Sequence, residues 1–145
     1  MNKSSFASLE ERVYRLNSLY RWYHLVAGAV FLVVAVLIRD LWFISIPIAL
    51  FAAFMVARPF ATAVIVDQHS VTLKRMFSKN SLLRSSITAI ERVPTGRGTL
   101  LVFWGNIEEK EQLAIAVNVF AFDEAWDDWL KSYRDISGDK PLSLF

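Results

Sequence analysis

Two apolar runs dominate the pattern of hydrophobic and polar positions along the chain. The first covers residues 22–38 and the second covers residues 41–57, so each is 17 residues long, and neither contains Lys, Arg, Asp or Glu. As helices they would measure about 25 Å, slightly less than the roughly 30 Å hydrocarbon core of a bilayer. Because only Arg39 and Asp40 separate them, the pattern predicts a transmembrane hairpin over residues 22–57 with these two residues at an aqueous turn.

Three other structures for these two apolar runs are disfavoured. One continuous helix would bury Arg39 and Asp40 near the middle of the bilayer, at a cost of about 2.5–3.5 kcal/mol each. A buried helix pair in a soluble protein would need a larger domain around it than the remaining residues can build. A cleaved signal peptide does not fit, because a long and mostly polar stretch precedes the first run and a second run follows at once.

Basic residues are concentrated on one side of the predicted hairpin. They precede the first span and follow the second, whereas the turn has only Arg39; the flanking residues are Lys3, Arg12, Arg15, Arg21, Arg58, Lys74, Arg75 and Lys79. Because positively charged flanks stay on the cytoplasmic side, we expect both termini in the cytoplasm. The expected location is the inner (cytoplasmic) membrane, as a multi-pass protein, with the lipid bilayer as one partner.

Small side chains recur along both spans and predict a packing seam. The second span has one at every fourth position and the first has two that lie one heptad apart; the seam residues are Ser45, Ala49, Ala53, Ala57, Gly28 and Ala35. Small residues at such spacings share one helix face and allow another backbone to approach closely. Either the two spans of one chain pack along this seam, or the same face contacts a membrane partner or a second copy of the chain.

Residues 1–21 form an amphipathic segment ahead of the predicted hairpin. Apolar residues recur at three- and four-residue steps over residues 5–23, which predicts a helix; they are Phe6, Leu9, Val13, Leu16, Tyr20 and Tyr23. Such a helix either lies along the lipid head groups or packs on the rest of the protein. Periodicity leaves both arrangements open, since it does not identify the apolar partner.

The pattern changes from helical to strand periodicity after Arg58. Short β-rich runs follow over residues 61–66, 70–77, 82–86, 87–93, 99–104 and 111–119. A final helix with an aromatic face is expected from Asp123, a good N-cap. The predicted fold class is therefore a membrane α-helical hairpin joined to a mostly β, α+β domain over residues 59–136. We expect six or seven strands in a partly open barrel capped by the C-terminal helix, followed by a tail over residues 137–145.

The order of these elements resembles a known family. A membrane hairpin followed by FATAVIVDQHSVTLKRMFSKNSLLRSSITAIERV looks like the bacterial pleckstrin-homology (PH)-like domains of small membrane proteins. The segment SSITAIERV matches the part that introduces a middle strand, and the final helix with Trp126 and Trp129 is similar to the capping helix of that fold. The resemblance covers about residues 59–136 and implies a PH-like barrel with a binding or scaffolding role. It implies no ligand and no reaction.

Composition narrows the chemistry. Apolar residues make up 54% of the chain and charged residues 21%, and the mean hydropathy is +0.36. The absence of cysteine excludes disulfides, thiolate metal sites and a cysteine nucleophile. No catalytic, cofactor-binding or metal-binding motif accompanies the two histidines, His24 and His69, so we expect no enzyme activity, no cofactor and no metal. The formal net charge of +2 is too small for a dedicated nucleic-acid-binding protein.

Charge is distributed unevenly over the predicted domain. Residues 58–97 contain seven Lys or Arg against two Asp or Glu, a net charge of +5, whereas residues 98–145 contain four against nine, a net charge of −5. Because a basic residue near an anionic leaflet gains about 1 kcal/mol, we predict lipid-surface contacts for Arg21, Arg58, Lys74, Lys79 and Arg84. The alternative is an ordinary solvated edge. Lys74 and Arg75 are strand neighbours that face opposite ways, so they are not expected to form one head-group site.

These observations favour a binding function at the membrane. The principal hypothesis is a membrane-anchored PH-like interaction or scaffold module, an accessory or assembly component of the inner membrane that binds a protein partner or forms a homo-oligomer. The alternative is a lipid-handling or transport-associated component with a site between hairpin and domain. That alternative would need a polar group inside the membrane, and over residues 25–38 and 41–57 only Ser45 qualifies.

Overall fold

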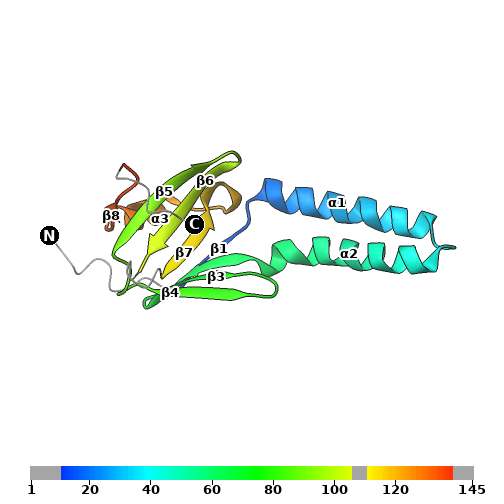
Figure 1. Cartoon of the computed structure of the whole chain (residues 1–145), viewed down its shortest axis with the longest axis horizontal. Coiled ribbons are helices and arrows are strands. Elements are labelled where there is room, and N and C mark those ends of the chain that lie inside the picture. The colour runs from blue at the N-terminus through cyan, green and yellow to red at the C-terminus, as the bar shows by residue number, and fades with distance from the viewer. Residues whose placement is uncertain (1–10, 106–110, 139–145) are drawn as a thin grey trace.

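A pair of long helices projects from one end of a β-sheet domain, which makes the molecule elongated (Figure 1). The computed structural model describes residues 11–105 and 111–138. In chain order the elements are β1 (Arg12–Arg15), α1 (Ser18–Leu37), α2 (Trp42–Ala61), β2 (Ala63–Val66), β3 (Ser70–Lys74), β4 (Lys79–Leu83), β5 (Ala89–Thr95), β6 (Gly98–Trp104), β7 (Gln112–Ala116), a 3₁₀ turn (Val117–Val119), α3 (Glu124–Leu130) and β8 (Arg134–Asp135).

The helix pair is inserted between two strands that pair with each other. β1 precedes α1 and β2 follows α2, and the two strands are antiparallel, with Arg15 opposite Ala63 and Arg12 opposite Val66. The chain therefore leaves the sheet after β1, runs through both helices and returns as the neighbouring strand. Because both strands are fixed in one sheet, the domain ends of α1 and α2 are held side by side.

β1 corrects the prediction of a helix over residues 5–23. Within the described part of that segment, Arg12–Arg15 is a strand that belongs to the β domain. Tyr14 is 7% exposed and its neighbour Val13 is 48% exposed, which is the alternation of a strand. The apolar positions of this segment fit a helical period as well as a strand. Pairing with the edge of β2 makes residues 12–15 a strand.

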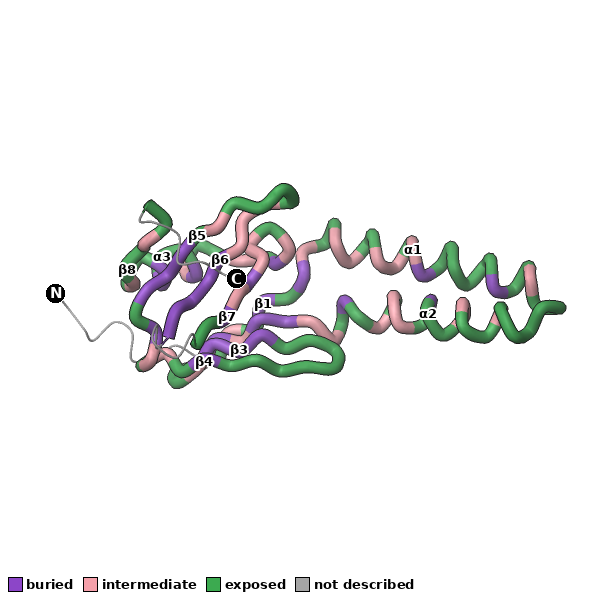
Figure 2. The backbone as a smooth tube through the Cα atoms, in the orientation of Figure 1, coloured by how far each residue is buried: buried purple, intermediate pink, exposed green. Residues whose placement is uncertain are grey.

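α1 and α2 are each 20 residues long, which corresponds to about 30 Å. They exceed the predicted spans because Asn17 caps α1 by accepting a hydrogen bond from the Tyr20 N–H at 2.9 Å, and because α2 continues through Pro59. Both helices are long and apolar enough to cross a membrane, and only 11% of each apolar stretch is buried within the protein (Figure 2). Arg39 and Asp40 form the connection between them, as predicted.

The two helices approach each other closely at Gly28. A methyl group added there would lie 2.6 Å from Val56 Cγ2 and 3.1 Å from the Ala52 carbonyl oxygen. Near the turn, the Ser45 hydroxyl donates a hydrogen bond to the Ala35 carbonyl at 2.8 Å. Of the predicted seam, Gly28 and Ala35 are buried, Ser45, Ala49 and Ala57 are half-buried, and Ala53 is exposed. The contact face of α2 is thus turned toward Ala52, which is buried.

The strands form two four-stranded sheets, and neither closes into the barrel that the pattern predicted. The first sheet has the order β1-β2-β3-β4, and the second has the order β7-β6-β5-β8 with β8 parallel to β5. Among the described residues the two sheets are joined by an isolated bridge between Leu16 and Phe120, not by a paired strand. A closed barrel would need the edge strands of one sheet, β1 and β4, to pair with those of the other, β7 and β8, and no such strand pair is present among the described residues.

α3 closes the core at the end of the domain away from α1 and α2 (Figure 1). The Trp126 ring centroid lies 4.0 Å from that of Phe122 and 6.0 Å from that of Phe103. Asp123 is the N-cap, as predicted, and its carboxylate accepts a hydrogen bond from the Trp126 N–H at 3.0 Å. The helix ends at Leu130, earlier than expected, because the chain then turns back to add β8 to the second sheet.

Asp123 also ties α3 to β1. Its carboxylate accepts hydrogen bonds from the Tyr14 hydroxyl at 3.0 Å and from the Arg12 guanidinium at 2.9 Å. Partial burial raises the pKa of this carboxyl, but the bonds from the Trp126 N–H and the Tyr14 hydroxyl and the charge of Arg12 outweigh burial, so the pKa lies below its ordinary value. The ionised form is therefore the one that stabilises the fold.

Replacing Asp123 by Ala is expected to lower the free energy of unfolding by about 1–2 kcal/mol at neutral pH, through loss of the cap and of the bonds to β1. The effect is present above the ordinary carboxyl pKa and shrinks as pH falls through the lower folded value, because protonation removes the same interactions. Circular dichroism melts of the full chain in detergent, across pH, measure it. Asp127→Ala is the control; an equal loss there would contradict the assignment.

Replacing Gly28 by Leu is expected to force α1 and α2 apart and to destabilise their contact by about 1–3 kcal/mol, because the new side chain overlaps Val56 and the Ala52 carbonyl. Ala29→Leu places the same side chain on the exposed side of α1 and serves as the control. Thermal unfolding in detergent micelles compares the two variants. Equal melting temperatures would show that the helices do not meet at Gly28.

Candidate functional site

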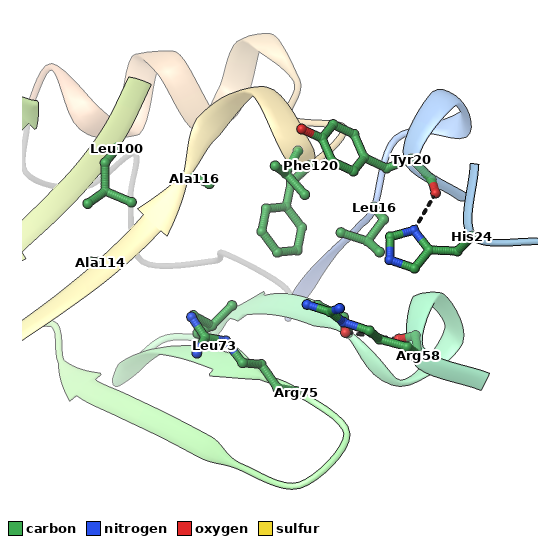
Figure 3. A pocket seen from close by; sticks show the side chains of 12 residues that line it. Leu16, Tyr20, His24, Arg58, Leu73, Arg75, Leu100, Ala114, Ala116 and Phe120 are labelled. Carbon is green, nitrogen blue, oxygen red and sulfur yellow. Dashed lines mark hydrogen bonds between the residues drawn. The ribbon is translucent and has the colours of Figure 1, made fainter. Parts of the chain in front are cut away.

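A pocket of about 400 Å³ lies where the helix pair joins the β domain (Figure 3). Its walls come from both sheets, from the first turns of α1, from the end of α2 and from the segment after β7. The lining residues are Leu16, Tyr20, His24, Arg58, Thr62, Leu73, Arg75, Leu100, Ala114, Ala116, Val119 and Phe120. Every ligand in this pocket would therefore contact the helix pair and the domain together.

Backbone pairing at the junction holds the walls of the pocket in place. The Asn17 N–H donates to the Val119 carbonyl at 2.9 Å, and the Ala121 N–H donates to the Arg15 carbonyl at 3.0 Å. These bonds fix the start of α1 against the segment after β7. Because β1 pairs with β2, the end of α2 is then held on the opposite side of the same opening.

Arg58 and Arg75 carry the permanent charge of the pocket. They come from α2 and from the turn after β3, and both side chains extend toward the space that Leu73 and Phe120 line (Figure 3). No Asp or Glu lines the pocket, and neither guanidinium forms an ion pair within the described part of the chain. The pocket therefore combines apolar walls with two exposed guanidinium groups that have no ion-pair partner among the described residues.

His24 and Thr62 add neutral polar groups. His24 Nδ1 lies 2.8 Å from the Tyr20 carbonyl oxygen, and since a carbonyl only accepts, Nδ1 donates this bond and leaves Nε2 unengaged by it. The Thr62 hydroxyl donates to the Arg58 carbonyl at 2.9 Å, so its oxygen still has acceptor capacity. Both side chains line the same pocket as the two arginines.

The turn between β3 and β4 extends beyond the core and forms a basic tip, which we define as residues 74–79. All six residues are exposed (Figure 2). Lys74 and Lys79 face each other across the two strands, and the apolar residues Met76 and Phe77 occupy the turn between them. Phe77 is 82% exposed, and the tip contains no acidic residue. Three cations therefore surround two exposed apolar side chains.

Phe77 positions the basic tip against α2. Its ring is parallel to that of Phe54, with an interplanar angle of 4° and centroids 5.9 Å apart. A second pocket of about 360 Å³ lies at this contact, and its lining residues are Phe54, Arg58, Thr62, Arg75, Met76, Phe77 and Ser78. It shares Arg58, Thr62 and Arg75 with the first pocket, so the two pockets adjoin.

Four of the five predicted lipid-contact residues lie at this end of the domain. Arg58 lines both pockets, and Lys74 and Lys79 are on the basic tip. The Arg21 guanidinium lies 5.5 Å from the centroid of the Phe60 ring, near the base of the helix pair. The structure thus groups these basic residues around the junction between helices and domain.

Arg84, the fifth, lies at the opposite end of β4 from the basic tip. Its guanidinium donates a hydrogen bond to the Asp67 carbonyl at 2.9 Å and lies 5.3 Å from the centroid of the Trp129 ring. Arg84 therefore links the turn between β2 and β3 to α3, and the structure does not bring it to the other four residues.

Arg75 and His24 are pocket residues that sequence reasoning missed as site residues. The expected alternation is present, since Arg75 lines the pocket and its neighbour Lys74 does not. Arg75 shares a strand face with Val71 and Leu73, both buried, and a cation at the end of such a face was the available signal. The sequence pattern does not indicate that Arg75 and Arg58 line the same pocket, because the two residues belong to different elements.

The described residues bring together no group of three or more His, Asp or Glu side chains that could hold a metal ion. Comparisons with protein-family models, curated proteins and solved structures find no match to this chain.

Proposed function

We propose that this protein is a membrane-anchored binding module whose helix pair crosses the bilayer and whose basic tip holds the β domain against the membrane surface. It acts as a PH-like interaction or scaffold module, an accessory or assembly component of the bacterial inner membrane, with both termini in the cytoplasm. Its proposed function is binding and not catalysis: the junction gathers cations and apolar side chains beside the polar groups of His24 and Thr62, a combination that suits anionic, amphiphilic surfaces.

The surface of α1 and α2 supports the membrane anchor. Large apolar side chains are exposed along both helices, among them Trp22 at 65%, Val30 at 57% and Leu50 at 67%. Exposing such surface to water costs about 25 cal/mol per Å². A helix pair in a soluble core would bury these side chains against the rest of the chain, whereas the β domain here meets the pair at its base (Figure 2).

The stacking of Phe77 on Phe54 is the observation that carries the proposal. When α2 spans a bilayer, this contact places the tip beside the last turns of the helix, at the boundary between hydrocarbon and head groups. Met76 and Phe77 then enter the apolar side of that boundary, while the stems of Lys74 and Lys79 extend toward the phosphates. The exposed apolar turn thereby gains an apolar environment.

Electrostatics favours the same position. Lys74 and Lys79 are direct cross-strand partners, and like charges in that arrangement destabilise a strand pair in water. Anionic head groups supply the missing counter-charge, worth about 1 kcal/mol per basic residue near the surface. An anionic leaflet therefore stabilises the conformation of the tip as well as its position.

The opposite end of the domain is suited to a protein partner. β1 to β4 form one antiparallel sheet, β5 to β7 pair antiparallel in the second, and α3 follows β7, an order that supports the PH-like assignment. α3 lies away from the helix pair and exposes Glu124, Asp127 and Asp128. With the basic tip on the membrane, this acidic surface faces the cytoplasm, where it is available to a basic partner or to a second copy of the chain.

Membrane contact of the tip can be measured with an environment-sensitive fluorophore, because the chain has no native cysteine. We expect a label on Ser78→Cys, in nanodiscs containing anionic lipid, to emit as in an apolar medium and to be quenched by spin-labelled lipid. Adding Phe77→Ser should shift the emission toward that of water, since the stack on Phe54 is lost. Gln68→Cys, at the opposite end of β3, is the control that stays in water. Water-like emission at Ser78 would refute the proposal.

The proposed topology has its own test. A cysteine at Asp40 should react with an impermeant thiol reagent in intact spheroplasts, because the turn between the helices lies outside. A cysteine at Ser137, in the β domain, should react only after lysis. The reverse pattern would show that the domain lies on the outer side of the membrane.

A further inference from the structure

We infer that the pocket between Arg58 and Arg75 is a specific binding site for one anionic phospholipid, with its phosphate between the two guanidinium groups and an acyl chain leaving past Phe54 and Phe77. Such a site requires α2 to lie in a bilayer, so it rests on the proposed function. It adds a defined lipid site to a surface whose basic tip contacts lipid without selecting a single molecule.

The two arginines indicate the charge of the ligand. Arg58 and Arg75 reach one pocket from two elements, no carboxylate lines it, and neither forms an ion pair with a described residue. Both side chains are exposed in this structure, and an anion bound in the shared pocket would be attracted by both charges. The planar guanidinium fork also matches the oxygen geometry of a phosphate group better than an ammonium does.

The walls of the pocket indicate a ligand that is larger than a free anion. The volume of about 400 Å³ lies within the range of about 300–1,000 Å³ that is typical of small-molecule sites. Leu16, Leu73 and Phe120 present apolar surface beside the arginines, and His24 and Thr62 present polar groups. A phosphate alone would leave this apolar surface without a partner, whereas the glycerol region of a phospholipid covers it.

The second pocket provides the route for the acyl chain. It adjoins the first at Arg58, Thr62 and Arg75, and it leads to the contact between Phe54 and Phe77. Phe54 belongs to α2, whose apolar surface faces the bilayer in the proposed arrangement. A lipid can therefore keep its tail in the membrane while its phosphate lies in the pocket, which favours a membrane phospholipid over free phosphate as the occupant.

The site is distinct from the surface contact that Lys74 and Lys79 make. Lys74 and Lys79 carry the same charge as the two arginines, lie on the same end of the domain and do not line either pocket. The double substitutions Arg58→Gln/Arg75→Gln and Lys74→Gln/Lys79→Gln change the net charge equally. The pair of variants therefore separates a pocket from general attraction to an anionic surface.

Native mass spectrometry of the full chain in mild detergent tests the site, with dioleoyl phosphatidylglycerol as the probe. We expect one retained lipid per wild-type chain and an affinity about tenfold or more weaker for Arg58→Gln/Arg75→Gln. Lys74→Gln/Lys79→Gln, which changes the basic tip outside both pockets, should weaken retention of the lipid less than the arginine variant does. Arg58→Lys/Arg75→Lys, which keeps the charge and loses the fork, should bind between these limits.

Three results would overturn the site. The first is an equal loss of lipid in the lysine variant, which would make the binding a general surface effect. The second is equal retention of dioleoyl phosphatidylcholine, which would remove the need for an anionic lipid. The third is displacement of the lipid by millimolar inorganic phosphate, which would make the pocket a site for free phosphate.

The label on Ser78→Cys separates failure of this site from failure of the proposed function. In the Arg58→Gln/Arg75→Gln background the label should still report an apolar environment, because Phe77 keeps its contact with Phe54. If the label does so while the arginine variant retains phosphatidylglycerol like wild type, only the lipid site is refuted. If the label reports water in the wild-type background, the proposed function is refuted.

Discussion

The pairing of β1 with β2 is the constraint on which the rest of the structure depends. These strands lie on either side of the helix pair in sequence, so their hydrogen bonds close a long connection whose ordering costs conformational entropy. The packing of α1 against α2, close enough that Gly28 has no room for a side chain, already brings the two ends of that connection together. Helix packing and strand pairing therefore stabilise each other, and together they fix the position of the helix pair relative to the β domain.

The site follows from this junction. A pocket between an inserted helix pair and the sheet that holds it takes residues from both, which is why Arg58 and Arg75 meet although they lie on separate elements. The position of the opening is set by backbone bonds at Asn17 and Ala121, which leave the side chains around it available for a ligand. In the proposed membrane-anchored module this opening lies at head-group level, where charged phosphates and hydrocarbon are both close by.

Charges are used differently at the two ends of the domain. Three ion pairs within the described residues lie away from the helix pair: Arg12 with Asp123, Arg92 with Asp135 and Lys131 with Asp128. Asp123 shows the consequence, because its bonds hold its pKa below the ordinary value and connect α3 to β1. The cations of the pocket and the basic tip have no such partners in the described chain, and in the proposed function an anionic ligand or surface supplies them.

Residue spacing by itself determined the two long apolar helices, the turn at Arg39 and Asp40, the β-rich region after them, and the N-cap at Asp123, because each depends on local periodicity or on a few neighbouring residues. It also indicated four of the five basic residues now grouped at the junction. Only the tertiary structure decided that residues 12–15 are a strand, that the sheets stay separate, and that Arg75 and Arg58 line the same pocket. These features depend on which distant edges pair, and hydrogen bonds between strands far apart in the chain leave no periodic trace in either strand.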